Sequence, residues 1–213
     1  MSKVKVACFS VSLDGFGAGV EQSLENPLGK RGSELHNWFY PTKTFRKNVL
    51  GKESGSEGID NSLAEKSFEN IGAWIIGRNM FGPVRGEWES TNWKGWWGEE
   101  PPYHVPVYVL THHKREPLVM KGGTTFYFVD GIESALKKAK EAAKGKDIRI
   151  GGGVTTIREF LEAGYIDEMH LAFSPVFLGK GENLFAQIDL HALGFNKIKR
   201  INGENATHII VTK

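Results

Sequence analysis

The first strand is predicted from an alternation of side chains near the N-terminus. Residues 4–11 alternate with the period of two that is typical of a β-strand, and Asp14-Gly15 after them is a turn pair. Short apolar runs closed by Gly, Pro or polar residues predict further strands at residues 73–77, 107–111, 125–129, 147–150 and 168–176. The connection between residues 197–201 and 207–212, which contains Asn202-Gly203-Glu204-Asn205, is too short for a crossover helix and predicts a closing antiparallel hairpin.

Helical patterns lie between several of these strands. Residues 62–71 and 132–143 each place apolar side chains on one face, which predicts two amphipathic helices. A third helix is expected to start at a capping box formed by Thr156 and Glu159 and to end near Gly164. Alternation of strands and helices favours an α/β fold with a largely parallel sheet. Residues 50–58 and the Trp-rich segment 82–106 are expected to be long loops.

Composition narrows the class of protein. A chain of 213 residues is predicted to form a single domain, and a formal net charge of +2 gives no reason to expect a nucleic acid or membrane partner. Cys8 is the only cysteine, so no internal disulfide can form. The N-terminal residues lack the apolar run of a signal peptide, and no apolar stretch approaches the roughly 20 residues that span a bilayer. We therefore expect a cytoplasmic protein.

The most distinctive local feature is a run of three glycines, Gly151–Gly153, between a buried strand and a helix. Glycines let the backbone approach a pyrophosphate, and the free N–H groups at a helix start attract negative charge. A tight turn without ligand explains this run equally well, so both interpretations stay open.

Two other predicted strands end in groups that bind anions. Gly77-Arg78 follows one strand, and Thr111-His112 ends another. The planar donor fork of an arginine suits phosphate, and ligands of open α/β sheets bind at the carboxyl ends of the strands. Three such strand ends together favour a cofactor rich in phosphate.

These residues resemble the dihydrofolate reductase superfamily, and within it the C-terminal reductase domain of bifunctional riboflavin-biosynthesis deaminase-reductases. The resemblance covers nearly the whole chain and rests most on Ser12-Leu13-Asp14-Gly15, Gly77-Arg78, the three glycines, and residues 166–171 leading into 175–185. It implies a three-layer α/β/α fold with a mostly parallel, eight-stranded central sheet and an antiparallel C-terminal strand. It also implies NADPH as cofactor and a homodimer.

The resemblance assigns residues to the cofactor and substrate as follows. The pyrophosphate is expected at Gly151, Gly152, Gly153, Val154 and Thr155 with support from Gly77 and Arg78, the adenosine 2′-phosphate at Thr111 and His112, and the nicotinamide near Ala7. The substrate is expected beside Ser12, Phe16 and Trp38.

The proton donor and the Trp-rich loop are the least determined features. Asp14, Glu34 and His36 are the candidate acids, although Asp14 also fits an ordinary turn. The loop tryptophans could stack on a flat heterocycle above the substrate pocket. Alternatively, they could cover the hydrophobic core or contact a dimer partner. The histidines at 104, 112 and 113 lack the spacing of a metal site, so none is expected.

The resulting prediction is an NADPH-dependent reductase of a small heterocycle, most closely a 5-amino-6-(5-phosphoribosylamino)uracil-like compound. A dihydrofolate or pterin reductase and a non-catalytic NADP-binding protein are the alternatives. A further possibility is that the glycine turn is structural and the Trp-rich loop binds another protein.

Overall fold

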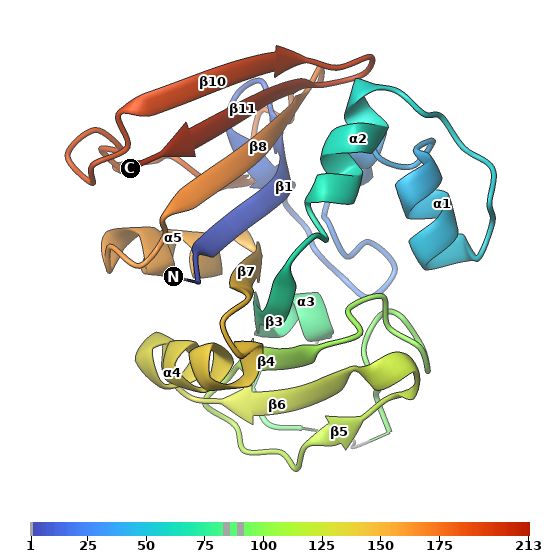
Figure 1. The fold of residues 1–213 in the computed structure, drawn as a ribbon, viewed down its shortest axis with the longest axis vertical. Helices are drawn as coiled ribbons and strands as arrows, with labels where there is room; N and C mark the ends of the chain where they lie inside the picture. The colour runs from blue at the N-terminus through green and yellow to red at the C-terminus, as the bar shows by residue number, and fades with distance from the viewer. Residues whose placement is uncertain (1, 83–85, 89–91) are drawn as a thin grey trace.

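A mostly parallel sheet forms the centre of the protein (Figure 1). The computed structural model describes residues 2–82, 86–88 and 92–213. Within these residues the sheet has nine strands: β1 Val4–Ser12, β3 Ile71–Gly77, β4 Pro106–Leu110, β5 Leu118–Val119, β6 Thr125–Val129, β7 Asp147–Gly152, β8 Glu168–Ser174, β10 Lys197–Asn202 and β11 Thr207–Thr212. Their order is β10-β11-β8-β1-β7-β3-β4-β6-β5. The pairs from β8 to β6 are parallel, and β11, β10 and β5 are antiparallel to their neighbours.

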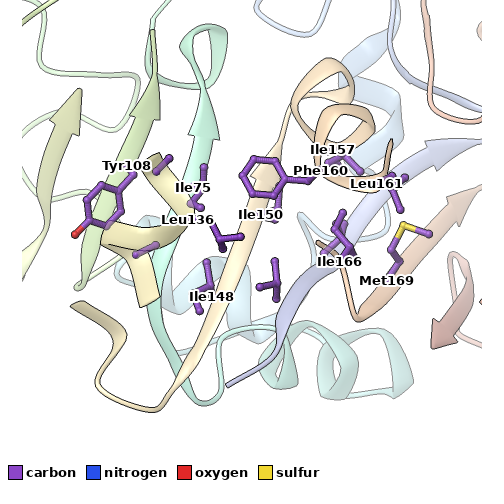
Figure 2. Close-up of a cluster of buried hydrophobic side chains, with 14 of the residues drawn as sticks. Ile75, Tyr108, Leu136, Ile148, Ile150, Ile157, Phe160, Leu161, Ile166 and Met169 are labelled. Atoms are coloured by element: carbon purple, nitrogen blue, oxygen red, sulfur yellow. The ribbon is translucent and has the colours of Figure 1, made fainter. Parts of the chain in front are cut away.

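Helices cover both faces of this sheet, as predicted for an α/β fold. Helices α4 (Ile132–Ala143) and α5 (Val154–Glu162) pack on one face. Figure 2 shows the resulting core, in which side chains of both helices meet alternate residues of the strands, such as Ile148 and Ile150 of β7. Helices α1 (Lys43–Leu50), α2 (Ile59–Lys66) and α3 (Arg78–Phe81) and the 3-10 helix η1 (Gly32–His36) lie with the opposite face. None of the described helices is long and apolar enough to span a bilayer.

The described strands outnumber the eight that were predicted. The additional strand β5 has two residues, and a separate small sheet pairs β2 (Phe16–Ala18) with β9 (Glu182–Asn183). Segments of two or three residues are too short to show a period-two pattern, so the sequence gives no signal for them. A second 3-10 turn, η2, covers Lys121–Gly123.

Two predicted helix boundaries were wrong. Helix α2 begins at Ile59 and ends at Lys66, and Ile71 belongs to β3 instead of the helix. The carboxylate of Glu204 accepts the N–H groups of Ile59 and Asp60 at 2.8 and 2.9 Å, so the cap comes from a residue 144 positions away in sequence.

The predicted capping box of the third helix was also wrong. Helix α5 begins at Val154 with Gly153 as its N-cap, so Thr156 lies inside the first turn. Gly164 does follow the helix end, with a φ of 72° that suits glycine.

Phe160 provides a test of the core between α5 and the sheet, because its ring is fully buried there. We expect Phe160→Ala to lower the free energy of unfolding by about 3–5 kcal/mol, measured by urea denaturation, through lost burial and a residual cavity. Phe177→Ala is the matched control, since Phe177 is 62% exposed, and its effect should stay within about 0.5 kcal/mol. Equal effects of the two substitutions would contradict this account of the core.

Candidate functional site

A large cavity opens at the carboxyl ends of β7, β3 and β4. Its volume is about 1330 Å³, which exceeds the roughly 300–1,000 Å³ of a site for one small ligand. The three strand ends that were predicted from the sequence all line this cavity. Their lining residues are Gly77, Arg78, Thr111, His112, Gly151, Gly153, Val154 and Thr155. Ala7 of β1 also lines it. The remaining predicted cofactor residue, Gly152, stands between two lining glycines.

The glycine turn is required by the way β7 leaves the sheet. A Cβ at Gly151 would lie 2.9 Å from a methyl group of Ile76, and Gly152 has a φ of 115° that favours glycine. Gly153 then starts α5 without any side-chain cap from the described residues. The first N–H groups of α5 are therefore available to an anion in the cavity, which lies against Val154 and Thr155.

Arg78 adds a guanidinium to the same wall. Its Nη1 donates to the Thr111 hydroxyl at 3.0 Å, and its Cζ lies 3.2 Å from the ring centroid of Trp88. Nε and Nη2 are buried without a hydrogen-bond partner among the described residues. Burial and, second, the nearby Arg115 lower the pKa of Arg78. A partly buried cation with two donors unused by the described residues, beside another cation, is suited to an anionic ligand.

The rim beside Arg78 carries a histidine–aspartate pair. His112 Nδ1 lies 2.7 Å from Asp130 Oδ1, and these side chains are 87% and 68% exposed. Both residues line the cavity. His112, which was predicted to face the adenosine 2′-phosphate, thus lines the cavity, and its contact with Asp130 orients the imidazole.

A second buried guanidinium, that of Arg149, was not predicted. Its Nη1 donates to the Ser67 carbonyl and hydroxyl oxygens at 2.7 and 3.1 Å, and its Nη2 to the Ala7 carbonyl at 2.7 Å. Its Cζ lies 4.1 Å from the Trp74 ring centroid. Burial lowers the pKa of Arg149 to about 10. No carboxylate among the described residues pairs with it.

Comparison with known proteins assigns the fold and family. The profile of the RibD C-terminal domain matches residues 5–207. The chain belongs to the RibD C-terminal domain family. This confirms the resemblance carried by the glycine run and by the motifs at Ser12 and Gly77.

One curated protein is similar to part of this chain. The uncharacterized protein YyaP of Bacillus subtilis (strain 168) is 30% identical over 95 residues, which cover 42% of this chain and 50% of YyaP. The chain thus matches about half the length of that curated relative.

Two solved structures share the fold of this chain. A putative riboflavin biosynthesis protein from Shewanella sp. PV-4 has a TM-score of 0.56 at 20% identity, covering 100% of this chain and 98% of that one. A deaminase/5-amino-6-(5-phosphoribosylamino)uracil reductase from Thermotoga maritima has a TM-score of 0.52 at 16% identity, covering 99% and 56%.

In this RibD C-terminal domain, the three candidate acids lie in different surroundings. Asp14 is not part of the cavity lining: its carboxylate accepts from Ser12 Oγ at 2.5 Å and from the N–H groups of Leu178 and Gly179 at 3.1 and 2.7 Å. Burial raises the pKa of Asp14, but these hydrogen bonds lower it by more. Glu34 forms a two-pronged ion pair with Arg31, also outside the lining, and that hydrogen bonding lowers the pKa of Glu34.

His36 is the candidate acid that lines the cavity. It ends the 3-10 helix η1 and stacks on Tyr40 with ring centroids 6.0 Å apart. Its Nδ1 is buried without a hydrogen-bond partner in the described part of the chain, and burial lowers the pKa of His36 to about 4. The imidazole is therefore neutral at neutral pH.

Among the predicted substrate residues, Trp38 lines the cavity and donates from Nε1 to Ser10 Oγ at 2.9 Å. Ser12 and Phe16 are not in the lining. The Ser12 hydroxyl instead holds the turn after β1, where it accepts the Phe16 N–H at 2.9 Å.

The tryptophans of the Trp-rich loop divide between the core and the cavity wall. Trp88 and Trp93 pack on the core cluster around Phe81 and Phe126, whereas Trp96 and Trp97 line the cavity. Part of the loop, residues 83–85 and 89–91, lies outside the described residues. A contact with a second protein chain stays a prediction.

Sequence reasoning also missed a polar cluster in the sheet. Cys8, His170 and His208 bring one sulfur or nitrogen atom each to within 4.8 Å of one another. Only Cys8 of these lines the cavity. Their sequence separations, 162 and 38 residues between neighbours, give no local motif.

His36 predicts a dependence of stability on pH. Because its pKa is about 4 in the folded protein and 6.5 ordinarily, the unfolded chain binds more protons between these values. Stability should therefore fall on acidification from pH 6.5 to about 4. His36→Phe should reduce that slope by up to about 1.4 kcal/mol per pH unit in urea titrations, whereas His191→Phe, at an exposed histidine, should not. An unchanged slope in His36→Phe would contradict the burial of a neutral ring.

Proposed function

We propose that this protein is an NADPH-dependent reductase that transfers hydride to a small heterocycle of the 5-amino-6-(5-phosphoribosylamino)uracil type. The observation that supports this most is the joint placement of the glycine turn, the uncapped start of α5 and Arg78 in one cavity wall. These groups offer backbone N–H donors and a cation without a carboxylate partner among the described residues, which is the chemistry that a dinucleotide phosphate requires. Membership of the RibD C-terminal domain family supports the same proposal.

The residues present fit NADPH. The start of α5 at Val154 and Thr155 would hold phosphate oxygens, and the orphaned Nε and Nη2 of Arg78 would gain acceptors that the described protein lacks. Thr111 and His112, at the end of the next strand, would face the 2′-phosphate. Ala7 would face the nicotinamide. When bound, the cofactor supplies the hydride, while the protein supplies position and electrostatics.

The rest of the cavity suits a flat heterocyclic substrate. Aromatic side chains dominate there, with Trp38, Phe39, Tyr40, Phe45, Trp74 and Tyr103 in the lining. Such rings stack on a planar heterocycle and exclude water from the reacting atoms. The neutral His36 would offer a hydrogen bond to the substrate. Its proton-donor role and the predicted homodimer stay predictions.

Calorimetric titration tests the cofactor site directly. We expect NADPH to bind and Arg78→Ala to weaken it by about tenfold to a hundredfold, because a charge-assisted hydrogen bond is worth about 1.5–3 kcal/mol. Arg200→Ala, on the exposed edge strand β10, is the matched control and should leave the affinity unchanged. Loss of binding in both variants, or in neither, would contradict the assignment of Arg78.

The substrate class requires a separate experiment. We expect oxidation of NADPH, followed by absorbance, with 5-amino-6-(5-phosphoribosylamino)uracil and much slower oxidation with dihydrofolate. The reverse preference would make the protein a pterin reductase. Tight NADPH binding without turnover of either compound would instead support a non-catalytic NADP-binding protein.

A further inference from the structure

Four polar side chains, from α2, β11, β8 and β1, form a continuous series of hydrogen-bonding contacts between α2 and the sheet. His208 Nε2 of β11 lies 2.9 Å from Asp60 Oδ1 of α2, and His208 Nδ1 lies 2.9 Å from His170 Nε2 of β8. His170 Nδ1 in turn lies 3.4 Å from Cys8 Sγ of β1. Asp60, His208 and His170 are only 2%, 0% and 7% exposed. The proposed reductase mechanism uses none of them.

Asp60 determines which nitrogen of His208 carries its proton. The other oxygen of Asp60 accepts the Asn205 N–H at 2.8 Å, so the carboxylate acts as an acceptor on both sides. His208 must then donate from Nε2, which leaves a lone pair on Nδ1, directed at His170. Histidines that bind metal ions commonly donate their second N–H to a carboxylate in this way.

The atoms on the other side of His208 are close to the positions of metal ligands. Cys8, His170 and His208 lie on neighbouring strands in the order β1, β8, β11, and their candidate ligand atoms are within 4.8 Å of one another. In a tetrahedral zinc site, bond lengths near 2.0 and 2.3 Å place ligand atoms roughly 3.3–3.6 Å apart. Here His170 Nε2 is 2.9 Å from His208 Nδ1 and 3.9 Å from Cys8 Sγ. These two distances differ from the tetrahedral values by roughly 0.4 Å. The third pair, Cys8 Sγ and His208 Nδ1, lies within 4.8 Å, so the ligand atoms must move together when an ion binds.

The charges around this cluster both favour and oppose a cation. Asp60 and a Cys8 thiolate would together balance a divalent ion. Arg149 opposes it, because its guanidinium acts electrostatically on Cys8 from the neighbouring strand β7. Burial keeps both groups neutral at rest, raising the pKa of Cys8 to about 12 and lowering that of His170 to about 3. Neutral imidazole is the form that binds metal.

We propose that Cys8 Sγ, His170 Nε2 and His208 Nδ1 bind one zinc-like divalent cation, with Asp60 positioning the His208 ring. On binding, the Cys8 thiol proton leaves to solvent and the His170 proton moves from Nε2 to Nδ1. One thiolate and two imidazoles suit zinc among the common divalent ions. Three protein ligands leave a fourth position open, and Cys8 is the ligand that lines the cavity. The site does not depend on the proposed reductase activity.

Cobalt(II) is the most direct probe, because Cys8 is the only thiol in the chain. After dialysis against a chelator, addition of CoCl₂ alone should produce a sulfur-to-cobalt charge-transfer band that saturates at one ion per chain. ZnCl₂ should displace that band. The same zinc addition should slow alkylation of Cys8 by iodoacetamide at least tenfold in the unmodified protein. No charge-transfer band and unprotected alkylation would overturn the proposal and leave the four residues as a hydrogen-bonded chain.

Substitutions separate ligands from the positioning residue. Cys8→Ser should abolish the charge-transfer band. Asp60→Asn should keep the band but weaken cobalt binding by about 10- to 100-fold, the usual effect of removing such a partner. His191→Asn, at an exposed histidine, is the matched control and should change neither property. A band that persists in Cys8→Ser would overturn the proposal, and circular dichroism of each variant distinguishes lost binding from lost folding.

Discussion

The pairing of β1 between β7 and β8 is the interaction on which both the cavity and the buried polar cluster depend. β1 pairs with β7 only at Val4 and Lys5, whereas its pairing with β8 continues to Ser12. The register with β8 shifts between Val6 and Phe9, and Cys8 has a φ of 51° within this bulge. β1 and β7 therefore part halfway along, toward the carboxyl ends of the strands, which is the edge where ligands of open α/β sheets bind. Arg149 crosses the opening by donating to the Ala7 carbonyl.

Two arginine side chains, Arg78 and Arg149, give the cavity wall positive charge. Arg78 and Arg149 both line the cavity, and burial lowers the pKa of each. A buried guanidinium is costly unless its donors are used or its charge is balanced. Arg149 recovers part of this cost from Ser67 and Ala7 and from the face of Trp74, but Arg78 leaves two nitrogens unused by the described residues. An anionic ligand at Arg78 would therefore meet donors that are already desolvated and fixed in place.

Features carried by adjacent residues could be predicted from the sequence, and features carried by distant residues could not. The strands and the Gly151–Gly153 turn follow from local patterns, and Gly77, Arg78 and Thr111, which were predicted from those patterns, line one cavity. The wrong start of α2 arose because Glu204 caps it from the far hairpin. Asp14 and Glu34 were proposed for their chemistry, but local hydrogen bonds from Ser12 and Arg31 hold them outside the lining. Neither the period of two of a strand nor the period of 3.6 of a helix predicts which side chains form these hydrogen bonds.

The cluster beneath α2 also ties the edge of the sheet to the cavity. Asp60 accepts from Asn205 in the final hairpin and pairs with His208 of β11, while Glu204 of that hairpin caps α2. The hairpin, α2 and β1 are thus joined by polar contacts, and those of His208 with Asp60 and His170 are buried, where apolar packing would cost less desolvation. His170 and His208 add little apolar burial there, and their hydrogen bonds end on a thiol in the cavity wall. Because apolar residues of similar volume often stabilise a fold as much as or more than a buried polar chain, the position of this chain beside the cavity is better explained by a ligand that uses it than by stability alone.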